Sequence, residues 1–539
     1  MNPLFSPASG AARYVSAVSD LGGTSDLDQQ RAPRARQAWL GGSLTHLSRW
    51  IIPILCVVLF AVFPLLSLFA QNQPEVEVTL LWRYLAVCVA IAIVLFGLFF
   101  LITRNSAKSG VVASLVVFGF FYYGMFLEGR PPLFLALWLG LVLIGIVAVL
   151  RTNRDLASLT VVLIVVATVM VVPQAFDVAR YQADHPYIAA SDPRLWPTDL
   201  AAPVVSSGVE LPDIYVISPD DYARTDILQQ YFDYDEGAFV RQMEQRGFVF
   251  ADDNRSPYSY SEMNMAALLN MDYLSNWPDL LPPESEDFNL VKRVSEDNRA
   301  ARLLESIGYD YIHLDTDEVT FVGGNPGISP FATEDSFGNL WLTKSILGQV
   351  GGSFGFTEAA SQERFRNTIR SEFDELRQVP SQDGPKFVVF HTLIPHDPFI
   401  FGPDGEDLTF PAGADHTTRV GMEYYVQQLQ YVQRQILDTV DQILADSPTP
   451  PVILLQADEG FEVDSEVFGE EAAQDMRLKG VGAFYLPGLA DPAVPDPPNT
   501  VNALRYVFNE YLGTDYPMLD SVSHLEGDLP FDFQEIPVR

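Results

Sequence analysis

The chain has 539 residues and a formal net charge of −36, with 33 Lys and Arg against 69 Asp and Glu. This length exceeds that of one compact domain, so we expect at least two structural units. An acidic chain repels phosphate backbones, which excludes a general nucleic-acid binder.

The acidity is concentrated in the second part of the chain. Residues 1–200 hold 13 Lys and Arg and 11 Asp and Glu, whereas residues 201–539 hold 20 and 58. The two cysteines, Cys56 and Cys88, both lie in apolar segments. The acidic part therefore has neither a disulfide framework nor a thiolate zinc site.

The first 200 residues predict a membrane region. Residues 1–49 are rich in Ser, Gly, Ala and Arg without lasting periodicity, which predicts a disordered cytoplasmic leader. Five apolar stretches follow, each about as long as a helix that crosses a bilayer, roughly 17–25 residues. They are Trp50–Ala70, Tyr84–Ile102, Gly110–Leu127, Pro132–Leu150 and Leu156–Phe176. A buried soluble bundle would need polar helix faces, which these stretches lack, so we predict five transmembrane helices over residues 50–176.

Basic residues predict the orientation of these helices. They precede the first span and lie between the second and third and between the fourth and fifth: Arg31, Arg34, Arg36, Arg49, Arg104, Lys108, Arg151 and Arg154. The positive-inside rule places the N-terminus in the cytoplasm. Five crossings of the plasma membrane then put a polar linker, residues 177–210, and an extracytoplasmic domain, residues 211–539, outside.

Strand and helix signals alternate in residues 211–539. The predicted elements are strands at 213–218, 386–392 and 452–457 and helices at Thr225–Gly247, with Gly247 as C-cap, and Thr417–Ala445. Strands that are apolar on both faces indicate a mostly parallel sheet flanked by helices, an α/β domain. The Gly-rich segment Gly323–Phe356 is interpreted as either a lid or a long surface insertion.

Each of the three predicted strands is followed by polar side chains. The pairs are Asp220 and Asp221, His391 and His396, and Asp458 and Glu459. One such pair is more often a solvated turn, but three pairs at the carboxyl ends of parallel strands converge on one edge of the sheet. Converging carboxylates require a cation or protons, and oxygen ligands favour Mg²⁺, Mn²⁺ or Ca²⁺. We predict one divalent cation, with the four carboxylates as its ligands.

The segment Arg255–Leu274 offers a nucleophile. Ser259 and Glu262 have the S-x-x-E spacing of a capping box, so the serines also have a purely structural interpretation as helix caps. Ser261 would lie in the first helical turn, where the dipole and a nearby cation stabilise an alkoxide and a bound phosphoryl group. Ser261 is the first candidate nucleophile and Ser259 the second.

The motifs also resemble a known family. The order is Asp220, a helix-start hydroxyl at Ser261, the PHDP sequence that contains His396, and Asp-x-Gly at Asp458. With the spans, this pattern resembles the sulfatase-like branch of the alkaline phosphatase superfamily, in particular membrane-anchored relatives of lipoteichoic acid synthase, which transfer phosphoglycerol outside the cell. The resemblance covers residues 211–532 and implies an alkaline phosphatase-like fold.

The resemblance also implies roles for individual residues. Asp220 and Asp458 would be metal ligands. Ser261, where relatives usually have Thr, would be the nucleophile. His396 would contact phosphoryl or sulfuryl oxygens or protonate a leaving group, and His391 would be a second substrate-binding residue.

Two positions depart from the family pattern. Relatives usually have His at the position of Glu459, and transferase-type relatives usually have Gly at the position of Asp221. Adjacent Asp220 and Asp221 resemble true sulfatases, but the SYSEM sequence lacks the context for conversion to formylglycine. Four ionised carboxylates around one divalent ion leave about two excess negative charges. The sequence leaves open a second ion, a shared proton or lost catalysis.

The sequence therefore predicts a membrane-anchored, metal-dependent phosphotransferase or phosphodiesterase that acts on lipid- or glycan-linked phosphodiesters outside the membrane. The alternatives are a catalytically inactive binding or scaffold protein and a sulfate-ester hydrolase. Transport is disfavoured, because the spans hold almost no ionisable residues. The bilayer is an expected partner, and the oligomeric state stays open.

Overall fold

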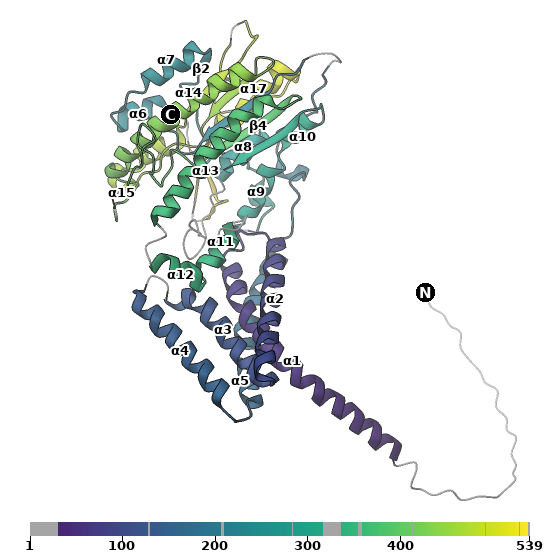
Figure 1. The fold of residues 1–539 in the computed structure, drawn as a ribbon. Coiled ribbons are helices and arrows are strands. Elements are labelled where there is room, and N and C mark those ends of the chain that lie inside the picture. Colours follow the sequence, from purple (N-terminus) through teal and green to yellow (C-terminus); the bar gives the residue numbers. More distant parts are fainter. Residues whose placement is uncertain are drawn as a thin grey trace, which may run out of the picture.

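The computed structural model has a helical bundle and an α/β domain, with two short helices between them (Figure 1). It describes residues 31–127, 130–205, 210–282, 284–315, 336–353, 358–411, 413–490, 492–527 and 529–536.

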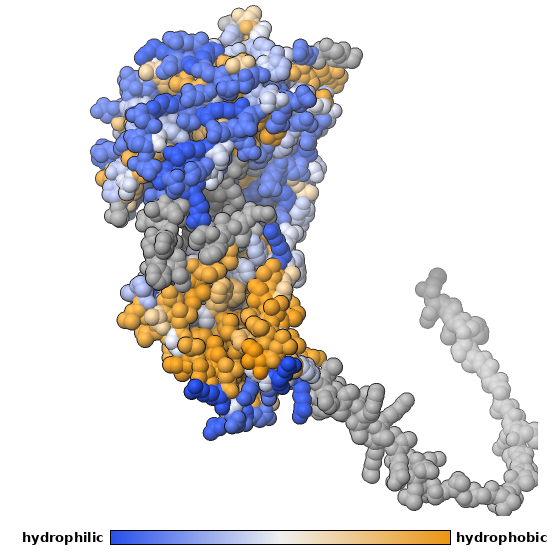
Figure 2. All heavy atoms as spheres, in the orientation of Figure 1, coloured by the Kyte–Doolittle hydropathy of each residue, from blue (hydrophilic) through white to orange (hydrophobic). Residues whose placement is uncertain are grey.

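Five long helices form the bundle. They are α1 (Arg31–Gln71), α2 (Val78–Thr103), α3 (Ser106–Leu127), α4 (Pro132–Arg151) and α5 (Ala157–Asp184). Each contains an apolar segment long enough to cross a membrane, which confirms the five predicted spans. Their apolar side chains form a band with hydrophilic surface on both sides (Figure 2).

The edges of the bundle differ from the prediction. Helix α1 begins at Arg31, so part of the predicted disordered leader is helical, and residues 1–30 lie outside the described residues. Helix α5 continues to Asp184. The predicted linker then packs on the α/β domain, because Leu195 is buried and its carbonyl accepts a hydrogen bond from Trp277 Nε1 at 3.2 Å. The orientation of the N-terminus stays a prediction.

The α/β domain is built on a six-stranded sheet in the order β2-β6-β5-β1-β4-β3. The strands are β1 (Ile214–Pro219), β2 (Phe248–Phe250), β3 (Asp310–Asp315), β4 (Lys386–Thr392), β5 (Val452–Gln456) and β6 (Gly482–Tyr485). Strands β5, β1, β4 and β3 are parallel, and β6 is antiparallel to both of its neighbours. The three predicted strands are confirmed as the neighbours β5, β1 and β4, and the sheet is mostly parallel as expected.

Helices cover both faces of the sheet. Alternate residues of a strand point to opposite faces. Tyr215 and Ile217 of β1 join one core, and Ile214 and Val216 join the other. The first core includes residues of α6 (Thr225–Tyr231), α7 (Gly237–Gln245), α13 (Glu358–Gln378) and α14 (Arg419–Asp446); the second includes residues of α8 (Ser261–Asn270), α10 (Arg299–Glu305) and α17 (Thr500–Leu512).

The remaining elements are short. They are the helices α9 (Phe288–Glu296), α11 (Ser336–Thr343), α12 (Ile346–Ser353), α15 (Ser465–Phe468) and α16 (Glu470–Leu478), the 3₁₀ turns Pro193–Leu195, Trp277–Asp279 and Val379–Ser381, and the hairpin β7 (Ser523–Glu526) and β8 (Phe533–Ile536).

The prediction of one helix over Thr225–Gly247 was wrong, because the chain forms α6 and α7 with a break between them. Asp233 in the break has a φ of 52°, and Glu236 turns its carboxylate into the core. Glu236 Oε1 accepts a hydrogen bond from Thr225 Oγ1 at 2.5 Å, and its Oε2 accepts two more, each at 2.8 Å. The two donors to Oε2 are Tyr222 Oη and Gln433 Nε2. Gly247 follows α7 with a φ of 95°.

The described part of Gly323–Phe356 contacts the membrane helices. Helix α11 places Phe337 and Trp341 in the hydrophobic core of the bundle. The Trp341 ring stacks on Phe121 of α3 at a centroid distance of 5.2 Å. This part of the segment is thus a contact between the two domains, and residues 323–335 and 354–356 lie outside the described residues.

Glu236 makes the stability of the α/β domain depend on pH. Burial raises the pKa of Glu236 from 4.5 to about 7. Its stabilising contribution is complete below the unfolded pKa and is lost as the pH rises through about 7, up to about 3 kcal/mol. We expect Glu236→Gln to unfold at a higher temperature than the wild type at pH 8 and to lose this advantage at pH 5. Thermal unfolding of the purified full chain at both pH values measures this difference.

The exposed Glu244 of α7 provides the control. Glu244→Gln should follow the wild type at both pH values. A Glu236→Gln variant that is equally destabilised at pH 5 and pH 8 would contradict the prediction.

Candidate functional site

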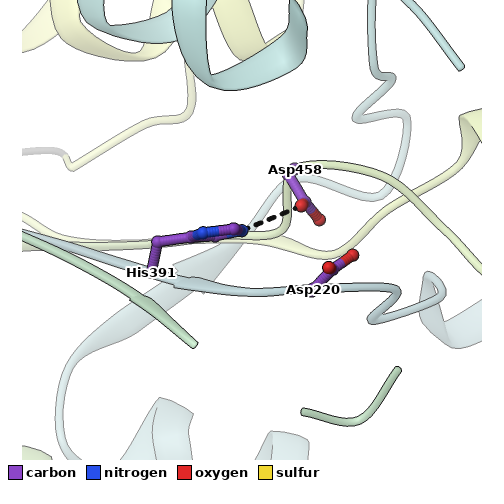
Figure 3. Close-up of side chains that lie close together, drawn as sticks. All are labelled: Asp220, His391 and Asp458. Atoms are coloured by element: carbon purple, nitrogen blue, oxygen red, sulfur yellow. Dashed lines mark hydrogen bonds and ion pairs between the residues drawn. The ribbon is translucent and has the colours of Figure 1, made fainter. Parts of the chain in front are cut away.

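Neighbouring strands bring three of the predicted residues together at the carboxyl edge of the sheet. Asp220 follows β1, His391 is near the end of β4, and Asp458 follows β5. Each offers a ligand atom, and these atoms all lie within 4.8 Å of one another. His391 Nε2 lies 3.1 Å from Asp458 Oδ2, and Figure 3 shows both side chains beside Asp220. We call this group the first cluster.

A second cluster consists of Asp220, Asp221 and Glu459, whose ligand atoms also lie within 4.8 Å of one another. Burial raises the pKa of Asp220 well above its usual range, and the nearby Asp458 adds to this effect. Burial also raises the pKa of Asp221 to about 6, although His396 and Arg477 oppose the shift. Burial raises the pKa of Glu459 well above its usual range, against the effect of Arg477. The carboxylates thus require protons or cations, as the sequence predicted.

Arg477 of α16 supplies one of these cations, and the sequence reasoning missed it. Its Nη2 lies 2.7 Å from Glu459 Oε1, and its Nη1 donates a hydrogen bond to Asp221 Oδ1 at 3.0 Å. Burial alone would lower the pKa of Arg477, but Glu459 and Asp221 outweigh burial and raise it, so the guanidinium stays charged. Nothing in the local sequence DMRLKG indicates this contact. The only signal was the excess negative charge of the predicted ligand set.

The backbone of Asp221 has a φ of 62°, in the left-handed region that favours glycine. A glycine would adopt this conformation without strain. Aspartate tolerates the left-handed region better than most residues. The ion pair with Arg477 gives its side chain a structural role here.

Ser261 is the first residue of α8 and faces the second cluster. Its Oγ lies 2.7 Å from Glu459 Oε1 and 3.3 Å from Asp220 Oδ1. The predicted capping box is wrong, because the N-cap residue of α8 is Tyr260, without a side-chain cap. Ser259 instead donates a hydrogen bond to Glu526 of β7. Of the two candidate serines, Ser261 is therefore the one whose hydroxyl faces the clustered acids.

His396 lies in the loop after β4. Its Nδ1 is 2.7 Å from the carbonyl oxygen of Asp397, and its Nε2 is 4.0 Å from Asp221 Oδ2. A carbonyl oxygen can only accept, so Nδ1 carries a proton. The atom of His396 that remains for proton exchange in the site is Nε2.

Asp220, His391 and Glu459 of the two clusters line a cavity of about 310 Å³. Ser261, His391, His396, Glu459 and Arg477 all line it. The cavity also reaches Tyr260, Phe288 and Lys292 of the α/β domain and Glu75 of the loop between α1 and α2. The cavity therefore lies between the edge of the sheet and the membrane bundle.

No protein-family model and no curated protein matches the sequence. Among solved structures, the C-terminal periplasmic domain of EcEptC from Escherichia coli is similar at 11% identity, with a TM-score of 0.37, over 62% of this chain and 98% of that one. The periplasmic domain of phosphoethanolamine transferase EptC from Campylobacter jejuni is similar at 10% identity and a TM-score of 0.32, over 57% and 91%. A protein in the alkaline phosphatase superfamily from Vibrio parahaemolyticus is similar at 13% identity and a TM-score of 0.35, over 66% and 81%. These likenesses concern the fold.

Replacing Arg477 by methionine leaves Asp221 and Glu459 buried without their counter-charge. We expect the free energy of unfolding to fall by about 3–5 kcal/mol at pH 8. The loss should be smaller at pH 5, because the two carboxyl groups take up protons there. Thermal unfolding at the two pH values tests this expectation.

The matched control is Arg246→Met, which removes an ion pair with the half-exposed Asp441 at 2.6 Å. This surface pair contributes about 1 kcal/mol or less. An Arg477→Met loss no larger than that of the control, or equal at both pH values, would show that Arg477 does not neutralise the buried acids.

Proposed function

We propose that this chain is a membrane-anchored, divalent-metal-dependent phosphotransferase or phosphodiesterase that acts on lipid- or glycan-linked phosphodiesters outside the membrane. The observation that carries the proposal is the position of the Ser261 hydroxyl. It lies at the start of α8, 2.7 Å from Glu459 Oε1 and beside Asp220 of the first cluster. A hydroxyl with a proton acceptor, a helix N-terminus and a metal-ligand set around it suits nucleophilic attack on phosphorus.

The donor set of the first cluster fits a divalent ion. Asp220 and Asp458 offer carboxylate oxygens, and His391 offers an imidazole nitrogen. Zn²⁺ and Mn²⁺ accept such mixed ligands, Mg²⁺ less readily, and Ca²⁺ takes six to eight oxygens. The raised pKa of Asp220 supports the fit, because burial and the nearby Asp458 both oppose its ionisation unless a cation is present. When bound, the ion would stabilise negative charge on the phosphoryl oxygens.

The roles of His391, Asp221 and Glu459 in this proposal differ from those predicted from sequence. His391 was expected to bind substrate and is assigned here to the ion, whereas the two acids were expected to be metal ligands. Both acids pair with Arg477, so we assign them to that guanidinium rather than to the ion. Glu459 Oε1 is also the nearer acceptor for the Ser261 hydroxyl. We therefore propose Glu459 as the residue that takes the Ser261 proton.

The first step forms a bond between Ser261 Oγ and phosphorus while the Ser261 proton passes to Glu459 Oε1. The bond from phosphorus to the leaving oxygen breaks, and that oxygen takes a proton from His396 Nε2. In the second step, an acceptor hydroxyl or water attacks phosphorus and gives its proton to His396. Ser261 Oγ departs and regains its proton from Glu459, so both residues return to their starting states.

A catalytically inactive binding or scaffold protein is the second candidate. The observation that favours it is the same Arg477, whose guanidinium pairs with Glu459 and Asp221 of the second cluster. Such a pairing also satisfies buried acids in a protein without catalysis. The content of bound metal distinguishes the two candidates.

The Ser261→Ala variant should lose phosphodiester turnover by a factor of at least about 10³, because no covalent intermediate forms without the nucleophile. Turnover is measured on phosphoglycerol lipids and small phosphodiesters with Mn²⁺ or Zn²⁺ supplied. In the wild type, quenched reactions should contain a phosphorylated peptide that includes Ser261. Ser259→Ala is the control and should stay active. Turnover that persists in Ser261→Ala would eliminate Ser261 as the nucleophile.

The Asp458→Asn variant should lose its divalent ion, because one ligand of the first cluster becomes a neutral amide. Elemental analysis of the purified full chain should give about one ion per wild-type chain and less than about a tenth of that in the variant. Asp441→Asn on the surface of α14 is the matched control and should retain the ion. A wild type without stoichiometric metal after supply of Mn²⁺ and Zn²⁺ would favour the scaffold candidate.

A further inference from the structure

The membrane bundle contributes a residue to the candidate catalytic cavity. Glu75 lies in the loop between α1 and α2, residues 72–77. It lines the same cavity as Ser261 and Glu459, which lie in the α/β domain. Residues of both domains therefore line the cavity. We call the side formed by Glu75 and its partner Lys292 the outer wall; Glu75 lies in the loop that joins the ends of the membrane helices α1 and α2.

Helix α9 holds this loop in place through several polar contacts. Asn289 makes two hydrogen bonds to the loop, from its backbone N to Pro74 O at 3.0 Å and from its Nδ2 to Gln73 O at 2.8 Å. Two charged pairs add to them. Lys292 Nζ donates to Glu75 Oε2 at 3.0 Å, and Arg293 Nε donates to Glu77 Oε1 at 3.0 Å. Apolar residues of α9 also share a buried core with those of α8, whose first residue is Ser261. The loop and the candidate nucleophile are thus positioned by two helices that pack on each other.

Lys292 is the cation on the outer wall of the cavity. Its side chain is 24% exposed and that of Glu75 is 22% exposed, so the pair is in contact with the cavity without being fully solvated. Lys292 Nζ donates to two oxygens of Glu75, and an ammonium group has three N–H donors. Among the described residues the structure gives the third donor no acceptor. It can reach an anionic oxygen in the cavity.

The cavity also has an apolar part. Apolar and aromatic side chains line it beside the polar Glu262, Ser295, Glu296 and His313; they are Tyr260, Met265, Leu269, Phe288 and Leu393. These apolar side chains suit the carbon skeleton of a lipid better than a fully hydrated sugar phosphate. The α1–α2 loop joins the ends of two candidate membrane spans, so the headgroup of a bilayer lipid would lie near the level of this loop.

We propose that Lys292, held by Glu75, is a specificity-determining residue that selects a phosphodiester lipid residing in the same bilayer over a soluble phosphodiester. The Lys292 ammonium binds an anionic oxygen of the lipid, and the α1–α2 loop forms the entrance through which the lipid reaches Ser261. This inference rests on the proposed function and deepens it by naming the physical form of the substrate.

The test uses the full chain in vesicles of phosphatidylcholine with phosphatidylglycerol, and separately with the soluble diester bis(p-nitrophenyl) phosphate. The readout is kcat/KM for the lipid divided by kcat/KM for the soluble diester. Lys292→Met should lower this ratio about tenfold or more, because it loses a charge-assisted hydrogen bond. Glu75→Gln should lower it about threefold to tenfold, and Lys292→Arg should retain most of it.

Glu77→Gln is the matched control. Glu77 belongs to the same loop and pairs with Arg293 of the same helix, but it lines a different cavity. Glu77→Gln should change the ratio by less than about twofold, since partly exposed ion pairs such as that of Glu77 with Arg293 contribute little. The Lys292→Arg variant separates loss of the cation from misfolding.

Three outcomes would overturn the inference. Equal losses on both substrates in Lys292→Met would make Lys292 a support of the fold. A Glu77→Gln loss as large as that of Glu75→Gln would show that docking of the loop, and not the cavity wall, sets the ratio. A wild type inactive on both substrates would overturn the proposed function itself, whereas turnover of the soluble diester alone would overturn only the selection of lipid.

Discussion

The ion pairs of Arg477 with two buried carboxylates are the interaction on which the site depends. Asp220, Asp221, Asp458 and Glu459 are each at most 4% exposed, and such a group is stable only with compensating positive charge. Arg477 supplies one charge, so a single divalent ion in the first cluster would leave about one excess negative charge in place of about two. The guanidinium thus neutralises part of the excess negative charge of the four carboxylates. The sequence alone had suggested a second ion, a shared proton or lost catalysis as the explanations for that charge.

The fold and part of the site were predictable because they follow from local patterns. Apolar runs identified β1, β4 and β5, and the carboxyl ends of parallel strands necessarily meet, which brought Asp220, His391 and Asp458 together. The contacts of Arg477, Glu236 and Glu75 could not be predicted in this way. Each of these contacts joins segments that are far apart in the chain. The charged side chain is wholly or partly buried only because its partner comes from a distant segment, which no local pattern reveals. The break between α6 and α7 has the same cause, since Glu236 is bonded by Gln433 of α14.

Two of the contacts that the described residues make between the membrane bundle and the α/β domain bear on the site and its position. Helix α9 binds the α1–α2 loop through hydrogen bonds and ion pairs, and α11 inserts aromatic rings into the bundle core. The first contact lies beside the cavity, and the second lies in a segment that the sequence predicted to be either a lid or a long surface insertion. Polar and apolar contacts together resist both sliding and tilting of one domain on the other. The fold itself therefore sets the position of Ser261 relative to the membrane helices.

The aromatic rings of α11 also bear on any attempt to produce the α/β domain alone. Phe337 and Trp341 are at most 5% exposed in the full chain because Phe69, Tyr84 and Phe121 of the bundle cover them. Excision of the membrane helices uncovers these rings together with the apolar residues beside them. A contiguous apolar surface in water promotes self-association. A truncated fragment would thus need detergent or polar replacements in α11, and its behaviour in solution would say little about the intact protein.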